Sequence, residues 1–438
     1  MGELRYENFT VDGAQGSNDP RGAEFVRAID YGFLESPRGA ENEVAQLDRF
    51  RAENTVLGAV YDDGQDPRAV GSQRPVATFG DYVGSVCVVP GVVLPAQMVT
   101  EVTVRGTHRR RGILTKLMTS ALQRAKDDGL ALSLLTASEG GIYGRFGFGV
   151  SAFSSTVTIP VAKGLQLRAQ VAESLKSSGM SVIVPSWEAF ATMYEDVFAA
   201  FQLATPGQTG HTRSYRDRAA GKSNPWAVKG EDRAWRPLVV LGADGAALAY
   251  AITEFAGFEK EPLTLKIADL GAANPLAELA LWEALGATDL AEQLRWREAP
   301  DDFALPYALI NQRDVKVAER DDHLWLRILD LPAAFESRGL RGEGTLTLKV
   351  SDRLGHIAGE WTLDSRGGST TVTPGIDASA EGAPSLAIDA EGLGTLFLGT
   401  VLPSVLVGSG RAVASSADLD ALDAMFMTFK APRNAYTF

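Results

Sequence analysis

The spacing of hydrophobic residues changes twice in the stretch that begins MVTEVTVRG. Val102 and Val104 alternate with polar residues there, which is the spacing of a strand. From Ile113 to Ala125 the apolar residues recur at helical spacing, so a helix with one buried face is expected. The helix should stop near Gly129, and LALSLLTA after it is typical of a buried strand. These residues predict a strand–helix–strand unit with a right-handed crossover.

Other regions show related patterns. FVRAIDYGFL predicts a short helix, while VLGAVYDDG and RPVATFGDYVGSVCVV predict strands. RPLVVLGADGAALAYAITEF predicts a hairpin that turns at ADG, and LTLKIADLGAANPLAELALWEALG predicts a strand, a loop and a helix. HLWLRILDLPAAFESRGL should form a strand and a helix, followed by strands in TLTLKVSD, HIAGEWTLD and STTVTP and a helix in GLGTLFLGTVL. We expect this last region to be an α+β domain with an antiparallel sheet.

The turn before the first predicted helix reads HRRRG, with Arg109, Arg110 and Arg111 in front of Gly112. The first backbone N–H groups of a helix lack internal partners and favour an anion. Arginines add charge-assisted hydrogen bonds, although without a ligand they oppose the helix dipole. A solvated basic turn is the simpler reading, but the strand, glycine and amphipathic helix around the run favour a diphosphate ligand. The second unit, with GAANPLAE at this place, has no such arginines.

Composition narrows the function classes. The 438 residues include 42 Lys and Arg against 55 Asp and Glu, a net charge of −13. Such an acidic chain is unsuited to general nucleic-acid binding and favours a cationic small molecule or a lysine-rich protein. The single cysteine, Cys87, excludes an intrachain disulfide, should be a buried thiol and fits a cytoplasmic setting. We find no signal region, no apolar run long enough for a membrane span, and no histidine or cysteine cluster for a metal.

Several motifs together resemble a known family. EVTVRGTHRRRGILTKLMTSAL is similar to the acetyl-coenzyme A signature of the GCN5-related N-acetyltransferases (GNAT), although Leu114 stands where small residues are usual. THRRRGIL, ASEGGIYGRFGFG, DHLWLRILDLPAAFESRG and the aromatic last residue resemble the enhanced intracellular survival (Eis) acetyltransferases. The resemblance implies tandem GNAT folds followed by a sterol-carrier-protein-like α+β domain. At ~150 residues per domain this agrees with three domains, which we place at 1–154 (catalytic), 155–312 (degenerate) and 313–438.

The resemblance also implies a set of site residues. The acetyl-CoA site would comprise Val102, Thr103, Val104, Arg109, Arg110, Arg111, Gly112, Ile113, Leu114, Thr115, Ser138 and Glu139. Tyr143 would be the general acid and the α-carboxylate of Phe438 the general base, its chain end entering the active site. A phenol titrates near ~10, so it can protonate a leaving thiolate at neutral pH. The competing interpretations are a packing tyrosine and a frayed chain end.

Asp30 and Phe33 lie in AIDYGFLESP and could hold a polycation, but a core Phe33 and a solvated Asp30 are equally compatible with the sequence. From the resemblance we expect an acetyl-CoA-dependent enzyme, without a metal, that acetylates primary amines directly. Aminoglycosides are the expected acceptors, and lysine side chains of proteins are the alternative. A non-catalytic protein that binds CoA or a lipid is the rival from another class. The family also implies a homo-hexamer.

Overall fold

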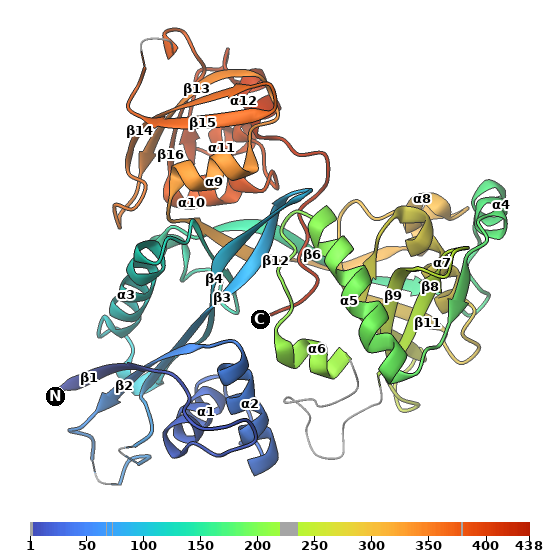
Figure 1. Ribbon diagram of the computed structural model, residues 1–438, viewed down its shortest axis with the longest axis horizontal. Coiled ribbons are helices and arrows are strands. Elements are labelled where there is room, and N and C mark those ends of the chain that lie inside the picture. The colour runs from blue at the N-terminus through green and yellow to red at the C-terminus, as the bar shows by residue number, and fades with distance from the viewer. Residues whose placement is uncertain (1–2, 67, 72, 220–234, 378–379) are drawn as a thin grey trace.

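The computed structural model describes residues 3–66, 68–71, 73–219, 235–377 and 380–438 (Figure 1). The first part of the chain forms β1 (Leu4–Phe9), α1 (Pro20–Gly32), α2 (Ala40–Ala52), β2 (Val56–Asp62), β3 (Ala77–Val89), β4 (Val92–Val104), α3 (Ile113–Asp127), β5 (Leu132–Thr136) and β6 (Gly149–Pro160). The middle part forms α4 (Ala169–Ser177), β7 (Ser181–Ile183), α5 (Trp187–Ala204), α6 (Arg213–Ala219), β8 (Arg236–Leu241), β9 (Ala247–Phe255), β10 (Thr264–Ala272), α7 (Pro275–Gly286), β11 (Gln293–Ala299), α8 (Leu305–Ala308) and β12 (Lys316–Ile328). The last part forms α9 (Leu331–Arg338), β13 (Gly344–Ser351), β14 (Gly359–Arg366), β15 (Ser369–Pro374), β16 (Ser385–Asp389), α10 (Ala390–Phe397), α11 (Pro403–Gly408), β17 (Ala412–Val413) and α12 (Leu419–Phe426).

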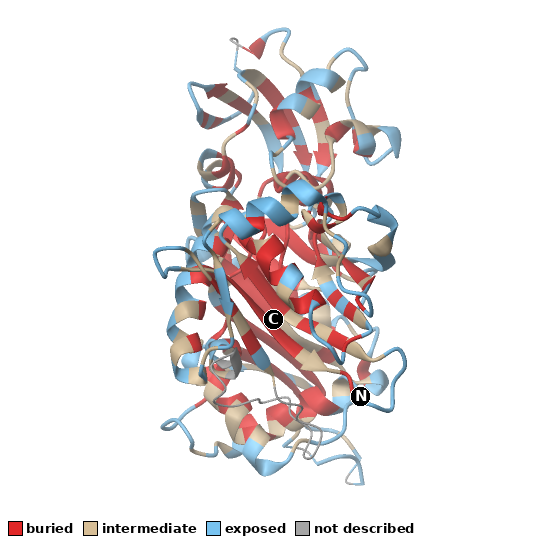
Figure 2. Cartoon of the chain, turned by 90° about the vertical axis from the view of Figure 1, so that its right-hand side faces the viewer, coloured by how far each residue is buried: buried red, intermediate tan, exposed pale blue. Residues whose placement is uncertain are grey.

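Within the described residues, one long sheet runs through the first two parts of the chain in the order β1-β2-β3-β4-β5-β12-β6-β11-β10-β9-β8-β7. Buried residues follow the strands in the middle of this sheet (Figure 2). The last part of the chain packs beside it with its own sheet, ordered β15-β14-β13-β16-β17 (Figure 1). The C-terminus returns from there to the centre of the molecule, between the first and middle parts.

The strand–helix–strand unit expected from the hydrophobic spacing is present as β4, α3 and β5. The two strands are parallel, with Gln97–Val99 opposite Ser133–Leu135. The helix buries the residues at helical spacing, namely Ile113, Leu117, Met118, Ala121, Leu122 and Ala125. Gly129 takes a φ of 80°, and its N–H donates to the Lys126 carbonyl, which ends the helix as predicted.

The middle part repeats this arrangement. The predicted hairpin is β8 and β9, turning at Gly245 with a φ of 81°. The predicted strand and helix are β10 and α7, and β10 runs parallel to β11 over Thr264–Ile267. The hydrophobic pattern did not indicate α5, whose N-cap is Ser186, the residue whose hydroxyl accepts from the Ala189 N–H.

Two features of the last part differ from the expectation. Its sheet is mixed rather than antiparallel, because β16 returns beside β13 in the same direction. The strand in HLWLRIL does not join that sheet but lies between β5 and β6 as β12. Residues 324–328 of β12 are all buried, so both faces of the strand need cover, which the middle of the long sheet provides.

Close backbone contact joins α10 to this region. A Cβ on Gly149 would lie 2.0 Å from the Glu391 carbonyl oxygen, and one on Gly394 would lie 2.3 Å from the Leu326 carbonyl oxygen. The Ser151 hydroxyl also donates to the Gly394 carbonyl over 2.7 Å. Glycine at both positions is therefore required for the last part to pack against β6 and β12.

A buried ion pair completes this joint. Arg327 on β12 donates to both carboxylate oxygens of Asp352, over 3.0 and 2.8 Å, and each side chain is 1% exposed. Burial opposes ionisation of Asp352, but the charge and hydrogen bonds of Arg327, together with the backbone N–H groups of Ile357 and Leu354, outweigh burial, so the pKa of Asp352 is lowered.

Replacing Asp352 by alanine should therefore lower the free energy of unfolding by about 3–5 kcal/mol, because Arg327 would stay buried without its carboxylate partner. Urea unfolding followed by circular dichroism measures this. Glu360→Ala is the control, since Glu360 forms an exposed pair with Lys349 over 3.6 Å and should cost less than about 1 kcal/mol. Equal losses in the two variants would contradict the structural role of the buried pair.

Candidate active site

The parallel strands β4 and β5 separate at a β-bulge. Thr78 of β3 lies opposite Thr103, but Gly80 lies opposite Thr100, so β4 has one extra residue between these pairs. Glu101 in the bulge has a φ of 54°, a backbone conformation that residues other than glycine rarely adopt. Its carboxylate accepts from Arg49 over 2.7 Å, and this ion pair is nearly buried. The pair holds the bulge in place.

Beyond the bulge, β4 has an open edge. Its pairing with β5 ends at Val99, and β5 itself ends at Thr136. Val102 and Val104 pack, partly buried, on the α3 side of the sheet, whereas Thr103 is buried on the α1 side. The backbone groups on this edge can therefore pair with an extended ligand, as a further strand would.

The arginine turn, residues 109–112, leads from β4 into α3. Arg109 and Arg110 are exposed and Arg111 is half-buried. Arg110 and Gly112 have φ values of 62° and 74°, and a Cβ on Gly112 would meet no atom within 4 Å. No side chain caps α3 at Gly112, so the first N–H groups of the helix face open space. Ile113 is buried, while Thr115 is exposed and lines a hollow that runs from Gly112 along the helix.

This geometry suits a phosphate-rich group. The matching helix of the middle part, α7, differs at this point. The Asn274 side chain accepts from the Ala277 N–H over 2.9 Å and caps α7, and Pro275 occupies its first position. One helix N-terminus is therefore closed by its own residues and the other is left for a ligand.

His108 supports the arginine turn from inside. It is buried, and its Nε2 lies 3.0 Å from the Asp62 carboxylate, while Nδ1 lies 2.8 Å from the Thr107 hydroxyl. Arg111 approaches the same carboxylate over 3.5 Å. The hydrogen bond from His108 is the main cause that lowers the pKa of Asp62. These contacts fix where β2 and the turn meet.

Tyr143 lies in the loop that follows β5. It is 6% exposed, and its ring packs edge-on against Phe148 and Trp325. Burial, and then the negative charge of Glu139, raise the pKa of its phenol above the usual value. The phenol is therefore protonated at neutral pH. Ser138 and Glu139, also after β5, are exposed.

The chain end reaches the same end of β5. The Thr136 hydroxyl donates to a main-chain oxygen of Phe438 over 3.3 Å. The Phe438 ring packs edge-on against Tyr82 of β3, with ring centroids 6.5 Å apart, and against Tyr436. The chain end is thus packed rather than frayed, and it brings a carboxylate to the point where β4 and β5 separate.

A loop of the middle part holds this C-terminal arm, residues 430–438. Its residues 205–211 form the anchor loop. The Thr209 hydroxyl donates to the Asn434 side chain over 2.9 Å, the Ala435 N–H donates to the Gln208 side chain over 3.0 Å, and the Tyr436 hydroxyl donates to the Gly210 carbonyl over 3.1 Å. The sequence pointed to Phe438 alone in the arm and gave no sign of the anchor loop, because the two segments become neighbours only in the folded chain.

Asp30 is not solvated, and Phe33 is not a core residue. Asp30 is 2% exposed, and its carboxylate accepts from Arg38 over 2.7 Å. Phe33 is 40% exposed at the end of α1. A Cβ on its neighbour Gly32 would touch Thr103, so this end of α1 lies against the open part of β4. Phe33 therefore remains available to a ligand, whereas Asp30 is occupied by Arg38.

Cys87 is fully buried in β3, as predicted, and burial raises the pKa of its thiol to about 11, which makes it a poor nucleophile. Among the described residues, we find no group of three or more His, Cys, Asp or Glu side chains able to hold a metal ion. No helix in the described part of the chain is long and apolar enough to cross a membrane.

Three stretches of the chain match protein families. Residues 21–151 and 215–328 match two acetyltransferase (GNAT) domain families, and residues 331–433 match a sterol carrier protein domain family. An uncharacterized N-acetyltransferase of Streptomyces griseus is 33% identical over 94% of this chain and 95% of its own. N-acetyltransferase Eis of Mycobacterium tuberculosis is 31% identical over 86% of this chain and 89% of its own. The chain belongs to the Eis family of N-acetyltransferases.

Solved structures agree with this Eis fold. Eis1 from Mycobacterium abscessus has a TM-score of 0.77 at 22% identity, covering 99% of this chain and 100% of that one. A GCN5-related N-acetyltransferase from Anabaena variabilis has a TM-score of 0.76 at 17% identity over 99% of this chain and 100% of that one. The protein is thus an N-acetyltransferase with two GNAT domains followed by a sterol-carrier-like domain, as the motifs implied. The non-catalytic rival is wrong, whereas the limits set between the domains stay predictions.

Proposed function

We propose that this Eis enzyme transfers acetyl from acetyl-CoA directly to a primary amine, with Tyr143 as general acid and the Phe438 carboxylate as general base. The observation that carries the proposal is the meeting of three features at one end of β5. These are the chain-end carboxylate beside Thr136, the protonated phenol of Tyr143 and the open edge of β4. A direct transfer needs an acid, a base and a channel for the donor at one place.

The site fits coenzyme A. The uncapped N-terminus of α3 and the arginine turn would hold the pyrophosphate, with Leu114 half-buried and Thr115 exposed beside it. The open edge at Val102, Thr103 and Val104 would pair with the amides of the pantetheine arm, and Ser138 and Glu139 would line the opposite side. Bound acetyl-CoA supplies the thioester whose acetyl group is transferred.

Two of the proton transfers in this reaction then involve this chain's own groups, one as acceptor and one as donor. The Phe438 carboxylate accepts a proton from the ammonium form of the acceptor, directly or through one water. The free amine attacks the thioester carbonyl and a C–N bond forms. The nitrogen then gives up a second proton to water, and the C–S bond breaks. Tyr143 donates its proton to the departing thiolate and regains one from solvent. Neither step uses Cys87, whose thiol stays buried and protonated.

The acceptor class rests on the family resemblance and on the net charge of −13. Polycations such as aminoglycosides are the proposed acceptors, with protein lysine side chains as the second candidate. Hexameric assembly and a cytoplasmic setting likewise remain predictions.

Colorimetric detection of free coenzyme A, with acetyl-CoA and a panel of aminoglycosides, lysine peptides and neutral amines, tests the proposal. Thiol release that no amine accelerates would reject it.

Replacing Arg110 and Arg111 together by alanine should raise the KM for acetyl-CoA about tenfold or more with little change in kcat. Each lost charge-assisted hydrogen bond is worth about 1.5–3 kcal/mol. Steady-state kinetics at saturating acceptor measure this. The control removes two exposed arginines elsewhere, by Arg68→Ala and Arg366→Ala. An unchanged KM in the first variant would make the run a solvated turn.

Extending the chain beyond Phe438 with a short tag should lower kcat on the order of 100-fold. The tag turns the carboxylate into an amide and displaces the acceptor. Binding of acetyl-CoA, followed by calorimetry, should stay unchanged because the arginine turn is untouched. The same tag at the N-terminus is the control. Full kcat in the C-terminally tagged enzyme would exclude the carboxylate as the base.

Tyr143→Phe should lower kcat about 100-fold or more, the usual contribution of a general acid, and should leave the KM for acetyl-CoA nearly unchanged. Because burial raises the pKa of Tyr143, the wild-type rate should not fall between pH 7 and about 10 through this group. Tyr307→Phe is the control, since Tyr307 is 68% exposed in α8. An unchanged kcat in Tyr143→Phe would assign the tyrosine to packing alone.

A further inference from the structure

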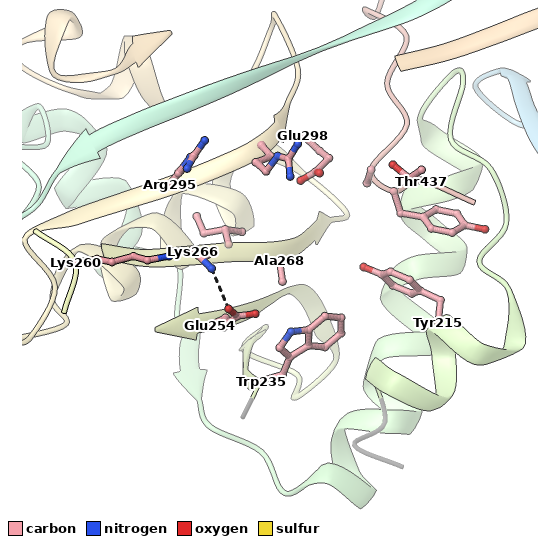
Figure 3. A pocket seen from close by; sticks show the side chains of 13 residues that line it. Tyr215, Trp235, Glu254, Lys260, Lys266, Ala268, Arg295, Glu298 and Thr437 are labelled. Carbon is pink, nitrogen blue, oxygen red and sulfur yellow. Dashed lines mark hydrogen bonds and ion pairs between the residues drawn. The ribbon is translucent and has the colours of Figure 1, made fainter. Parts of the chain in front are cut away.

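A cavity of about 440 Å³ lies on the middle-domain side of the C-terminal arm (Figure 3). Strands β9, β10 and β11 form one wall, and Ala435, Tyr436 and Thr437 of the arm form another. Tyr215 and Trp235 close it beside the arm, with ring centroids 6.2 Å apart. We call this space the cationic cavity.

The strand register concentrates positive charge on the first wall. Arg295 and Arg297 point to the same face of β11, because they flank the buried Trp296. Lys266 of β10 lies directly opposite Arg295, and Lys260 adds a fourth cation from the loop before β10. Like charges on directly opposed strand positions destabilise a sheet. The chain nevertheless places them there, although its net charge is −13.

The two acidic residues of the wall offset only part of this charge. Glu254 of β9 accepts from Lys266 over 3.0 Å, so that pair is internally balanced. Glu298 is partly buried, and burial raises the pKa of its carboxyl to about 7, which leaves it partly protonated at neutral pH. Among the described residues, Arg295, Arg297 and Lys260 form no ion pair of their own. Three cations therefore face the cavity with little negative charge beside them.

We propose that the cationic cavity binds a small molecule through a carboxylate or phosphate group, with Arg295 and Arg297 as its main ligands. Arginine guanidinium groups bind both anions in a bidentate manner. The aromatic rings of Tyr215 and Trp235, seen in Figure 3 across from Arg295, would contact an apolar portion of the same molecule. The anion would relieve the repulsion between neighbouring cations, and this energy is available only to a negatively charged occupant.

The position of the cavity lets its occupant affect the proposed catalytic carboxylate. The arm residues that line the cavity, Ala435 to Thr437, directly precede Phe438. An occupant would therefore contact Thr437, the residue directly before the one whose carboxylate we propose as the base. This consequence rests on the proposed function, whereas anion binding itself does not. The anion could belong to the acceptor amine or to a separate effector, and kinetics distinguish these sources.

Calorimetric titration of the full-length protein with inorganic phosphate and with citrate, at low salt, tests the site. The Arg110→Ala, Arg111→Ala background removes the arginine turn as a competing anion site. In that background, Arg295→Gln with Arg297→Gln should weaken binding about tenfold or more. Arg313→Gln with Lys316→Gln removes two exposed charges of the same region outside the cavity and should change nothing.

Two further variants separate charge from folding damage. Arg295→Lys with Arg297→Lys keeps the charge and should retain most of the binding. Glu298→Gln removes a competing carboxylate and should tighten binding. Equal affinities in the background and in the double glutamine variant, or no binding of either anion at millimolar concentration, would overturn the proposal.

Steady-state kinetics identify the source of the anion. If the acceptor supplies it, phosphate competes with the amine, and the double glutamine variant raises KM only for amines that carry a carboxylate or phosphate. If a separate effector supplies it, phosphate changes kcat and leaves the KM of the amine unchanged. Either result supports the site. A failure of the proposed chemistry, such as an unaffected tagged enzyme, would leave the titration result standing.

Discussion

The proposed active site depends on the anchor loop, residues 205–211, which holds the C-terminal arm against the first GNAT domain. The loop hydrogen-bonds to β3 on one side, where the Gly207 N–H donates to the Cys87 carbonyl and the Cys87 N–H donates to the Gln208 carbonyl. On the other side it binds the arm through Thr209 and Gln208. One short segment thus fixes the first domain, the second domain and the chain end relative to one another. These hydrogen bonds determine where the chain-end carboxylate lies.

The second GNAT domain holds the arm at the place where the first domain keeps an open strand edge. Its strands β10 and β11 separate after Ile267, with a register irregularity there, much as β4 and β5 separate after Val99. Arg433 of the arm is buried against that stretch of β10 and donates to the Leu270 carbonyl over 3.0 Å, with its guanidinium over the Trp296 ring. An internal side chain thus lies in the degenerate domain where an open edge would otherwise be, and α7 is capped by its own asparagine.

Local sequence patterns were sufficient to predict the helices and strands, but not to predict which of them pack or pair with each other. Helical spacing from Ile113 to Ala125 located α3, and the ADG turn located the β8–β9 hairpin, because both signals lie within a few adjacent residues. The motifs around Gly112 and Tyr143 pointed to the loops of the proposed site for the same reason. The same reasoning placed β12 in the wrong sheet, since apolar residues show that a strand is buried and not which strands cover it. The pairing of Asp30 with Arg38, and of residues 205–211 with the arm, depends on the tertiary fold.

The proposed base on the last residue would make catalysis depend on the whole domain arrangement. Ordering each backbone residue costs about 1–2 kcal/mol, while each hydrogen bond returns about 0.5–1.5 kcal/mol net. The bonds from the anchor loop therefore offset only a small part of the cost of ordering the nine residues of the arm, and burial of residues such as Arg433 and Tyr436 must supply most of the stability. Any change that loosens the second domain weakens these contacts before it reaches β4, β5 or the arginine turn. Loss of rate with retained donor binding is the signature expected of such a change, because the two halves of the site are held by different parts of the chain.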